Sequence, residues 1–118
     1  MQDKIYDSEY KLLELLWARE PISAKALSLA ATQEIGWNKN TTYTILKKLV
    51  EKGCVRREEP GFLCTSLLSR DDVRKAETRS LVDRLFGGSK KLLFSALLED
   101  ETLSEEDMAQ LRRMIDER

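Results

Sequence analysis

Helical spacing of apolar residues is the feature that most constrains the fold, and it recurs three times within the first 53 residues. Each of these segments follows a residue that commonly caps a helix, namely Ser8, Ser23 or Asn38. Pro21 stops the first segment, and the third ends at Gly53, where a left-handed backbone is easily adopted. The spacing therefore predicts three short helices separated by short turns.

The third helical segment is predicted to have one core face and one free face. Stepping 100° per residue places one set of side chains toward the core: Thr42, Ile45, Leu46 and Leu49. The other side carries Lys39, Asn40, Tyr43, Thr44 and Lys47. In or against the core we also expect the aromatic residues Tyr10, Trp17 and Trp37.

Two short strand-like runs, residues 54–59 and 62–66, follow the third helix and are separated by the turn pair Pro60-Gly61. They predict a β-hairpin. Three helices followed by a hairpin is the order of a winged helix-turn-helix, whose third helix enters the major groove of DNA. Cys54 and Cys64 lie in these runs. They are either reduced thiols packed as small apolar groups or, if they face each other, a pair that oxidation would link.

Further helices are predicted beyond the hairpin. A polar helix is broken by Gly87-Gly88, and a second helix begins at Ser89. A last helix begins at Ser104, which approximates a capping box with Asp107.

These C-terminal helices carry more apolar side chains than such short helices can bury alone. A second copy of the segment would cover them, and folding back as a helical cap on a monomer is the alternative. We favour pairing because a polar spacer separates the set from the first core. The predicted dimerisation residues are Leu81, Leu85, Phe86, Leu92, Leu93, Leu97, Leu98, Leu103, Met108, Leu111, Met114 and Ile115.

The sequence as a whole predicts a mainly α fold with a small β-hairpin wing. A winged helix-turn-helix head is expected in residues 1–68 and a helical dimerisation region in residues 69–118.

The charged residues are unevenly distributed, although the formal net charge is only −1. Residues 39–57 hold six basic side chains and one acidic one, whereas residues 98–118 hold eight acidic side chains and three arginines. One part of the chain can therefore face phosphates and the other cannot, which favours a double-stranded DNA operator as the partner.

The free face of the third helix supplies the candidate DNA-binding residues. Contacts to base edges are expected from Asn40, Thr41, Tyr43 and Thr44. Contacts to phosphates are expected from Lys39, Lys47 and Lys48. Strand alternation lets only one of Arg56 and Arg57 face the DNA from the wing.

The sequence lacks the residues that enzymes, metal sites and membrane-spanning segments require. The chain has no histidine, no glycine-rich phosphate loop and no nucleophile motif, so we expect neither an enzyme nor a metal or cofactor site. No stretch approaches the ~20 apolar residues that cross a bilayer, and the chain does not start with a secretion signal. We therefore expect no membrane partner and a cytoplasmic location.

Several of these motifs together resemble one family of regulators. The third helix matches a recognition-helix signature in the order Trp37, Thr41, Thr44, Leu46, Leu49, Lys52 and Gly53. Glu9, Leu16 and Trp17 resemble the first helix of that family. The segment from Leu81 through the Gly-Gly pair and Leu-Ser-Glu-Glu resembles its dimerisation region. On these motifs, nearly the whole chain resembles the penicillinase repressor family, BlaI/MecI/CopY.

The resemblance implies a homodimeric transcription repressor that binds a palindromic operator, often at β-lactam resistance or stress-response genes. Two alternatives stay open from the residues alone. A ligand-responsive regulator like those of the PadR or MarR type would need a cavity between the head and the C-terminal helices. A winged helix used only for protein–protein contact would bind little DNA even at low salt.

Overall fold

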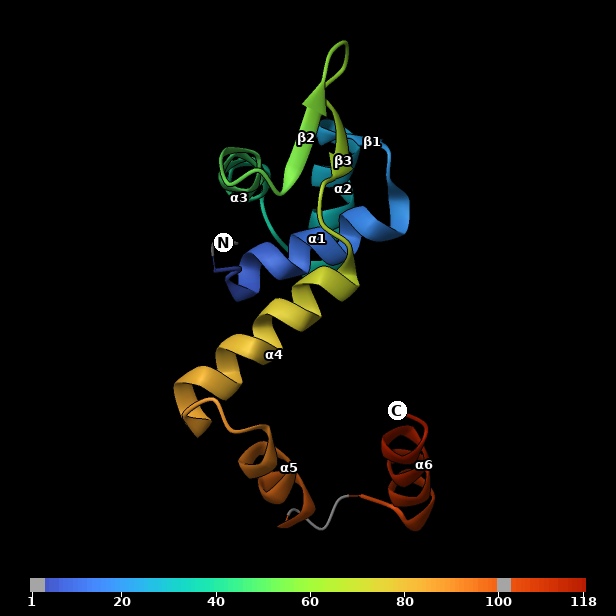
Figure 1. Ribbon diagram of the computed structural model, residues 1–118. Helices are drawn as coiled ribbons and strands as arrows, with labels where there is room; N and C mark the ends of the chain where they lie inside the picture. Colours follow the sequence, from blue (N-terminus) through green and yellow to red (C-terminus); the bar gives the residue numbers. More distant parts are fainter. Residues whose placement is uncertain (1–3, 100–102) are drawn as a thin grey trace. The chain divides into compact units, whose positions relative to one another are not determined.

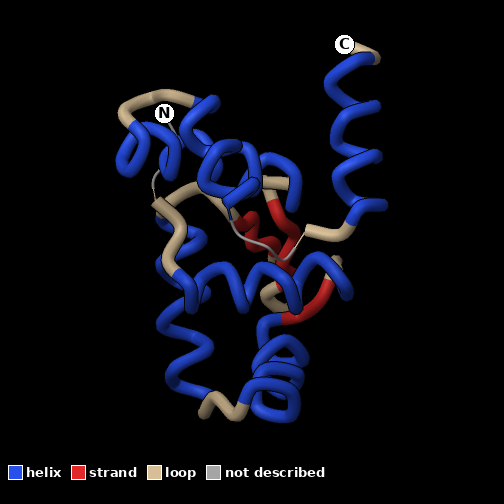
Figure 2. Tube along the Cα trace, turned by 90° about the horizontal axis from the view of Figure 1, so that it is seen from below, coloured by secondary structure: helices blue, strands red, loops and turns tan. Residues whose placement is uncertain are grey.

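The computed structural model describes residues 4–99 and 103–118. Contacts between Cα atoms divide the chain into two compact units, Met1–Glu77 and Thr78–Arg118. Most of the described chain is helical, and its short strands all lie in the first unit (Figure 2). None of the described helices is both long enough and apolar enough to span a membrane.

The first unit contains three helices, a small sheet and the beginning of a fourth helix (Figure 1). In chain order its elements are α1 (Asp7–Arg19), β1 (Ile22–Ser23), α2 (Ala24–Ile35), α3 (Lys39–Glu51), β2 (Val55–Glu58), β3 (Leu63–Ser66) and α4 (Arg70–Phe86). This order confirms the predicted winged helix-turn-helix. We call β2, β3 and the turn between them the wing.

Two of the three predicted N-caps are confirmed. The Ser23 hydroxyl accepts a hydrogen bond from the Ala26 backbone N–H at 3.1 Å, and the Asn38 side-chain oxygen accepts one from the Thr41 N–H at 2.8 Å. Each bond satisfies a backbone donor that has no partner inside its helix.

The prediction of Ser8 as the first N-cap is wrong. Helix α1 begins at Asp7, two residues earlier than a cap at Ser8 would place it, with Tyr6 as its cap residue. The Glu9 carboxylate reaches back and accepts a hydrogen bond from the Tyr6 backbone N–H at 2.9 Å. This is the acidic half of a capping box, and it starts the helix without a cap from Ser8.

The sheet has one strand that the sequence did not predict. Strand order is β1-β3-β2, with both pairs antiparallel. Two residues between α1 and α2 form the added strand, in which Ile22 lies opposite Cys64 and Ser23 opposite Leu63. A strand of two residues is too short to show an alternating hydrophobic pattern. It forms because the backbone N–H and C=O groups of β3 are hydrogen-bond partners for it.

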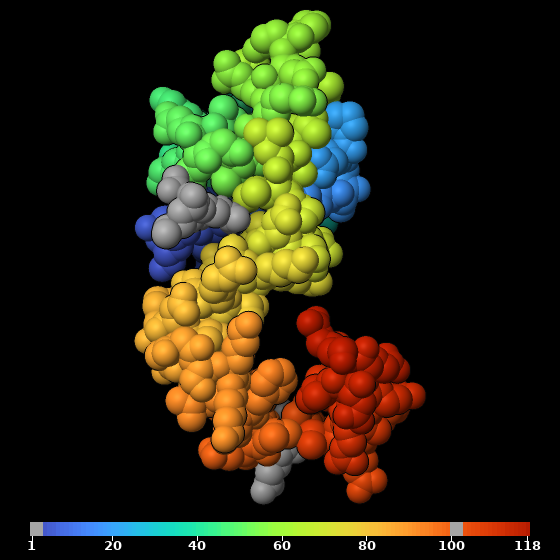
Figure 3. Space-filling view, in the orientation of Figure 1, coloured from blue at the N-terminus to red at the C-terminus, as the bar shows by residue number. Residues whose placement is uncertain are grey.

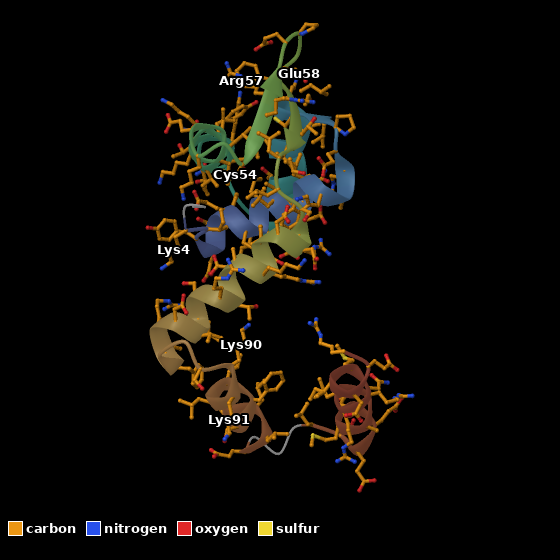
Figure 4. All side chains as sticks on the ribbon, viewed as in Figure 1. Lys4, Cys54, Arg57, Glu58, Lys90 and Lys91 are labelled. Atoms are coloured by element: carbon orange, nitrogen blue, oxygen red, sulfur yellow. The ribbon has the colours of Figure 1, made fainter. Side chains whose placement is uncertain are left out.

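The register of the wing shows that the two cysteines do not face each other across the hairpin, so the alternative of an oxidation-linked pair lacks its geometric condition. Cys64 lies opposite Arg57, whereas Cys54 precedes β2 and lies at its foot (Figure 4). Neither cysteine forms a disulfide, both are buried, and burial raises the pKa of the Cys64 thiol. The wing is therefore held by its strands and its core contacts, with both cysteines as small buried groups.

The core of the first unit lies among the three helices. Helices α1 and α2 both contact α3, and five leucines of this core are at most 1% exposed: Leu12, Leu13, Leu16, Leu27 and Leu49. Each contributes about 2 kcal/mol through burial. The aromatic residues pack against this core as predicted, and they are Tyr10, Trp17 and Trp37.

The second unit contains the rest of α4, then α5 (Lys90–Glu99) and α6 (Glu105–Asp116). Helix α4 ends at Gly87 and Gly88, which both have a left-handed backbone. The Ser104 hydroxyl caps α6 by accepting a hydrogen bond from the Asp107 N–H at 3.0 Å. These helix boundaries agree with the predicted ones.

A buried ion pair joins the start of α1 to the end of α3. Glu9 is 2% exposed, and its carboxylate lies 2.8 Å from the Lys52 ammonium. The same ammonium donates to the Lys4 carbonyl at 2.9 Å and lies 4.8 Å from the centre of the Tyr6 ring. The positive charge of Lys52 thus offsets most of the desolvation free energy that burial of the Glu9 carboxylate costs.

Replacing Lys52 by methionine should lower the free energy of unfolding by about 2 kcal/mol, because the Glu9 carboxylate would stay buried without its cation. Lys48→Met, on the exposed side of the same helix, should change it by less than about 0.5 kcal/mol. Urea unfolding of the two variants gives the comparison. Glu9→Gln combined with Lys52→Met should recover part of the loss, and equal stability of the two single variants would contradict this role.

Candidate nucleic-acid interface

Helix α3 has the two faces that the sequence predicts. Thr42, Ile45, Leu46 and Leu49 are buried, with exposed fractions between 0% and 9%. The opposite side is exposed at Lys39, Asn40, Thr44, Lys47 and Lys48. Helix α3 has 13 residues and is about 20 Å long. Its diameter with side chains, about 10–12 Å, fits the width of a DNA major groove, which is about 12 Å.

Two of the predicted base-reading residues are less available than the others. Thr41 and Tyr43 are half-buried, and the Tyr43 ring packs against the core of the first unit. The Lys39 ammonium lies 5.8 Å from the centre of that ring. Packing of the Tyr43 ring leaves Asn40 and Thr44 as the more open polar side chains of this face.

The N-terminal end of α3 is an electropositive position. Asn38 caps the helix, and no acidic residue occurs in its first turn. The helix dipole therefore places partial positive charge beside Lys39, where it adds to attraction for a phosphate.

Lys52 does not belong to the exposed basic surface. It is one of the six basic residues between positions 39 and 57, but its ammonium is bound by Glu9 and its side chain is 19% exposed. The signal that could have shown this was Glu9 itself, an acidic residue inside an otherwise apolar helical face.

Both wing arginines have acidic neighbours. Arg56 Nε lies 2.8 Å from Glu58 Oε1, and Arg57 Nε lies 4.0 Å from Glu59 Oε1. Arg57 also stacks on the Phe62 ring, with its guanidinium carbon 3.7 Å from the ring centre. Figure 4 shows Arg57 and Glu58 together near the far end of β2. The wing is consequently close to neutral, and it attracts phosphates less than α3 does.

The wing and α3 lie side by side. Figure 1 views α3 along its axis with the wing next to it, and the space-filling view shows both at the surface (Figure 3). The structure thus brings the candidate residues of α3 onto one exposed helix face, and Arg56 and Arg57 onto the strand that follows.

The second unit exposes many of the predicted dimerisation residues. Leu85, Met114 and Ile115 are more than 60% exposed, and three further leucines are about half exposed: Leu92, Leu97 and Leu98. The remaining residues of the set are half-buried: Leu81, Phe86, Leu93, Leu103, Met108 and Leu111. Exposed apolar residues at this density are typical of a surface that is covered in solution.

The part of the chain that the structure describes contains no cluster of three or more cysteine, aspartate or glutamate side chains able to hold a metal ion. The outer face of α3 offers the chemistry of a binding surface: ammonium groups, amide and hydroxyl side chains, and a helix N-terminus.

Comparison with known proteins identifies relatives over the whole length of the chain. The sequence model of a family described as penicillinase repressor matches residues 5–117. The penicillinase repressor of Bacillus licheniformis is 22% identical over 116 residues, covering 97% of this chain and 91% of the relative. The methicillin resistance regulatory protein MecI of Mammaliicoccus sciuri is 21% identical over 123 residues, with both chains fully covered.

A solved structure supports the fold of the first unit. The solution structure of the DNA binding domain of the repressor BlaI superposes with a TM-score of 0.55 and 22% identity. It covers 61% of this chain and 93% of that domain. This likeness confirms the winged helix-turn-helix fold.

Asn38→Ala should lower the free energy of unfolding by about 1 kcal/mol, because the first turn of α3 would lose its cap. Asn38→Asp should keep most of that stability, since the carboxylate also accepts the Thr41 N–H. Asn40→Ala, on the exposed face two residues later, is the matched control with an effect below about 0.5 kcal/mol. If thermal or urea unfolding gave equal losses for Asn38→Ala and Asn40→Ala, Asn38 would not be the residue that fixes the start of α3.

Proposed function

Because the chain belongs to the penicillinase repressor family, we propose that it is a DNA-binding transcription repressor that acts as a homodimer on a palindromic operator. The observation that carries the proposal is α3, a helix buried on one face and lined on the other by exposed lysine, asparagine and threonine side chains. This composition suits a recognition helix in a major groove. The family is one of repressors and does not consist of enzymes, and a repressor of this kind acts in the cytoplasm.

In this proposal Asn40 and Thr44 contact base edges, and Thr41 and Tyr43 contribute from their half-buried positions. An asparagine can bond two atoms of an adenine, and a threonine methyl group suits the methyl of thymine. The phosphate contacts come from Lys39, Lys47 and Lys48. Arg56 or Arg57 adds a contact from the wing only if a phosphate replaces its acidic partner.

Dimerisation follows from the number of phosphate contacts. One protomer offers few of them, so tight binding needs two half-sites on one dimer. We assign DNA binding to residues 1–68 and dimerisation to residues 69–118. The apolar residues of α4, α5 and α6 would then be covered by those of a second copy.

Selection from genomic DNA fragments tests the proposal. The purified protein is mixed with random fragments at moderate salt, and the retained fragments are sequenced. Recovery of an inverted repeat with half-sites about one helical turn apart supports the dimeric repressor. Retention without a motif, or none at low salt, would favour a winged helix used for protein contact.

Lys47→Ala should weaken operator binding about fivefold at moderate salt and reduce the slope of log K against log salt by about one for each protomer bound. Lys75→Ala, an exposed lysine of α4 paired with Asp71, is the control and should change neither value. Fluorescence anisotropy at several salt concentrations measures both quantities. The assignment of Lys47 to a phosphate contact would fail if both variants behaved like the parent chain.

Leu97→Glu combined with Ile115→Glu should convert the dimer to a monomer, because two charges would have to be desolvated in an apolar interface. Both side chains are largely exposed in one chain, at 49% and 63%, so helix content should be retained. Leu29→Glu, on the exposed side of α2 at 57%, is the control and should leave the mass unchanged. Analytical ultracentrifugation measures the mass of each variant in solution. If the doubly substituted chain stayed dimeric, the dimer interface would not include Leu97 and Ile115.

A further inference from the structure

An open cleft of about 730 Å³ lies in the first unit, away from the exposed face of α3. The end of α1 and the segment that leads from β3 into α4 form its walls. They include an aromatic ring, a carboxylate and an exposed leucine, contributed by Trp17, Glu20 and Leu67. Neither the DNA-binding surface nor the proposed dimer surface uses these side chains.

The aromatic wall is fixed in place and already carries a cation. The Trp17 indole N–H donates to the Leu68 carbonyl at 2.8 Å, and Tyr10 packs edge-on against the ring with centroids 5.8 Å apart. The Arg70 guanidinium lies 5.4 Å from the ring centre. Arg70 is exposed and is the first residue of α4, so another cation can replace it over the ring at little cost.

The carboxylate wall has hydrogen bonds but no counter-charge. Glu20 Oε1 accepts from the Ser66 N–H at 2.8 Å and from the Ser66 hydroxyl at 2.9 Å, and Oε2 accepts from the same hydroxyl at 2.9 Å. Both donors are neutral, and none of the ion pairs among the described residues involves Glu20. The half-buried carboxylate is thus oriented in the cleft by neutral donors, and it has no ion-pair partner among the described residues.

We propose that this cleft binds an organic cation with an apolar or aromatic body, such as a quaternary ammonium compound. Its charge would replace that of Arg70 over Trp17 and lie near Glu20, and its apolar part would cover Leu67, which is 51% exposed. An aromatic face beside a carboxylate is the usual chemistry for recognising such cations. The site lies in the first unit and does not depend on DNA binding.

The test uses the two tryptophan indole N–H signals of the full-length chain in nitrogen-15 NMR spectra. Benzyltrimethylammonium is the probe, and benzyl alcohol is the neutral control with the same ring. The Trp17 signal should shift and saturate with the cation, while Trp37, outside the cleft, serves as the internal reference. Equal binding of benzyl alcohol, or no saturable shift at Trp17, would overturn the proposal.

Two variants separate the contributions of the walls. Glu20→Gln keeps an oxygen that accepts from Ser66 but removes the charge, and it should weaken binding of the cation about threefold to fivefold. Arg70→Ala removes the competing guanidinium and should strengthen binding at least twofold. Glu14→Gln, on the exposed side of α1, is the control with unchanged affinity. Unchanged affinity in both Glu20→Gln and Arg70→Ala would also overturn the proposal.

Discussion

The direction in which α3 faces depends on its buried contact with α1 and α2. Thr42 and Leu49 are fully buried in that contact, and the pair of Glu9 and Lys52 ties the end of α3 to the start of α1. Separating the pair would leave a carboxylate buried without a cation, so the end of α3 cannot move freely from α1. Mostly the inner face of α3 packs against α1 and α2. The lysine and polar side chains of the outer face stay exposed and can contact DNA.

The basic residues between positions 47 and 57 therefore differ in their structural roles, although they are close in the sequence. Lys52 stabilises the fold, and Arg56 and Arg57 are close to acidic partners on the wing. Lys47 and Lys48 are exposed, and neither forms an ion pair with the residues that the structure describes. The number of basic residues in this segment thus overstates the charge that can meet phosphates. A surface with few phosphate contacts per protomer fits a protein that binds two half-sites at once.

Local signals in the sequence predicted most of the fold. The caps Ser23 and Asn38 and the glycine pair after Phe86 act through residues within one turn, so their patterns are readable. Strand β1 and the role of Lys52 depend on partners 40 or more positions away, which no short pattern encodes. The position of Cys64 opposite Arg57 depends on the register of the hairpin, which the turn pair alone did not reveal. The free face of α3 followed from helical spacing, whereas the partial burial of Tyr43 and the pairing of the wing arginines required the three-dimensional structure.

The proposed function depends most on whether the outer face of α3 is the surface that binds DNA. Titrating the nitrogen-15 labelled protein with a duplex recovered by selection, and following each backbone amide, tests this directly. The largest shifts should occur between Asn38 and Lys48, with smaller ones at the wing tip and little change around Glu20. Shifts concentrated in residues 78–118, with α3 unaffected by the duplex, would contradict it.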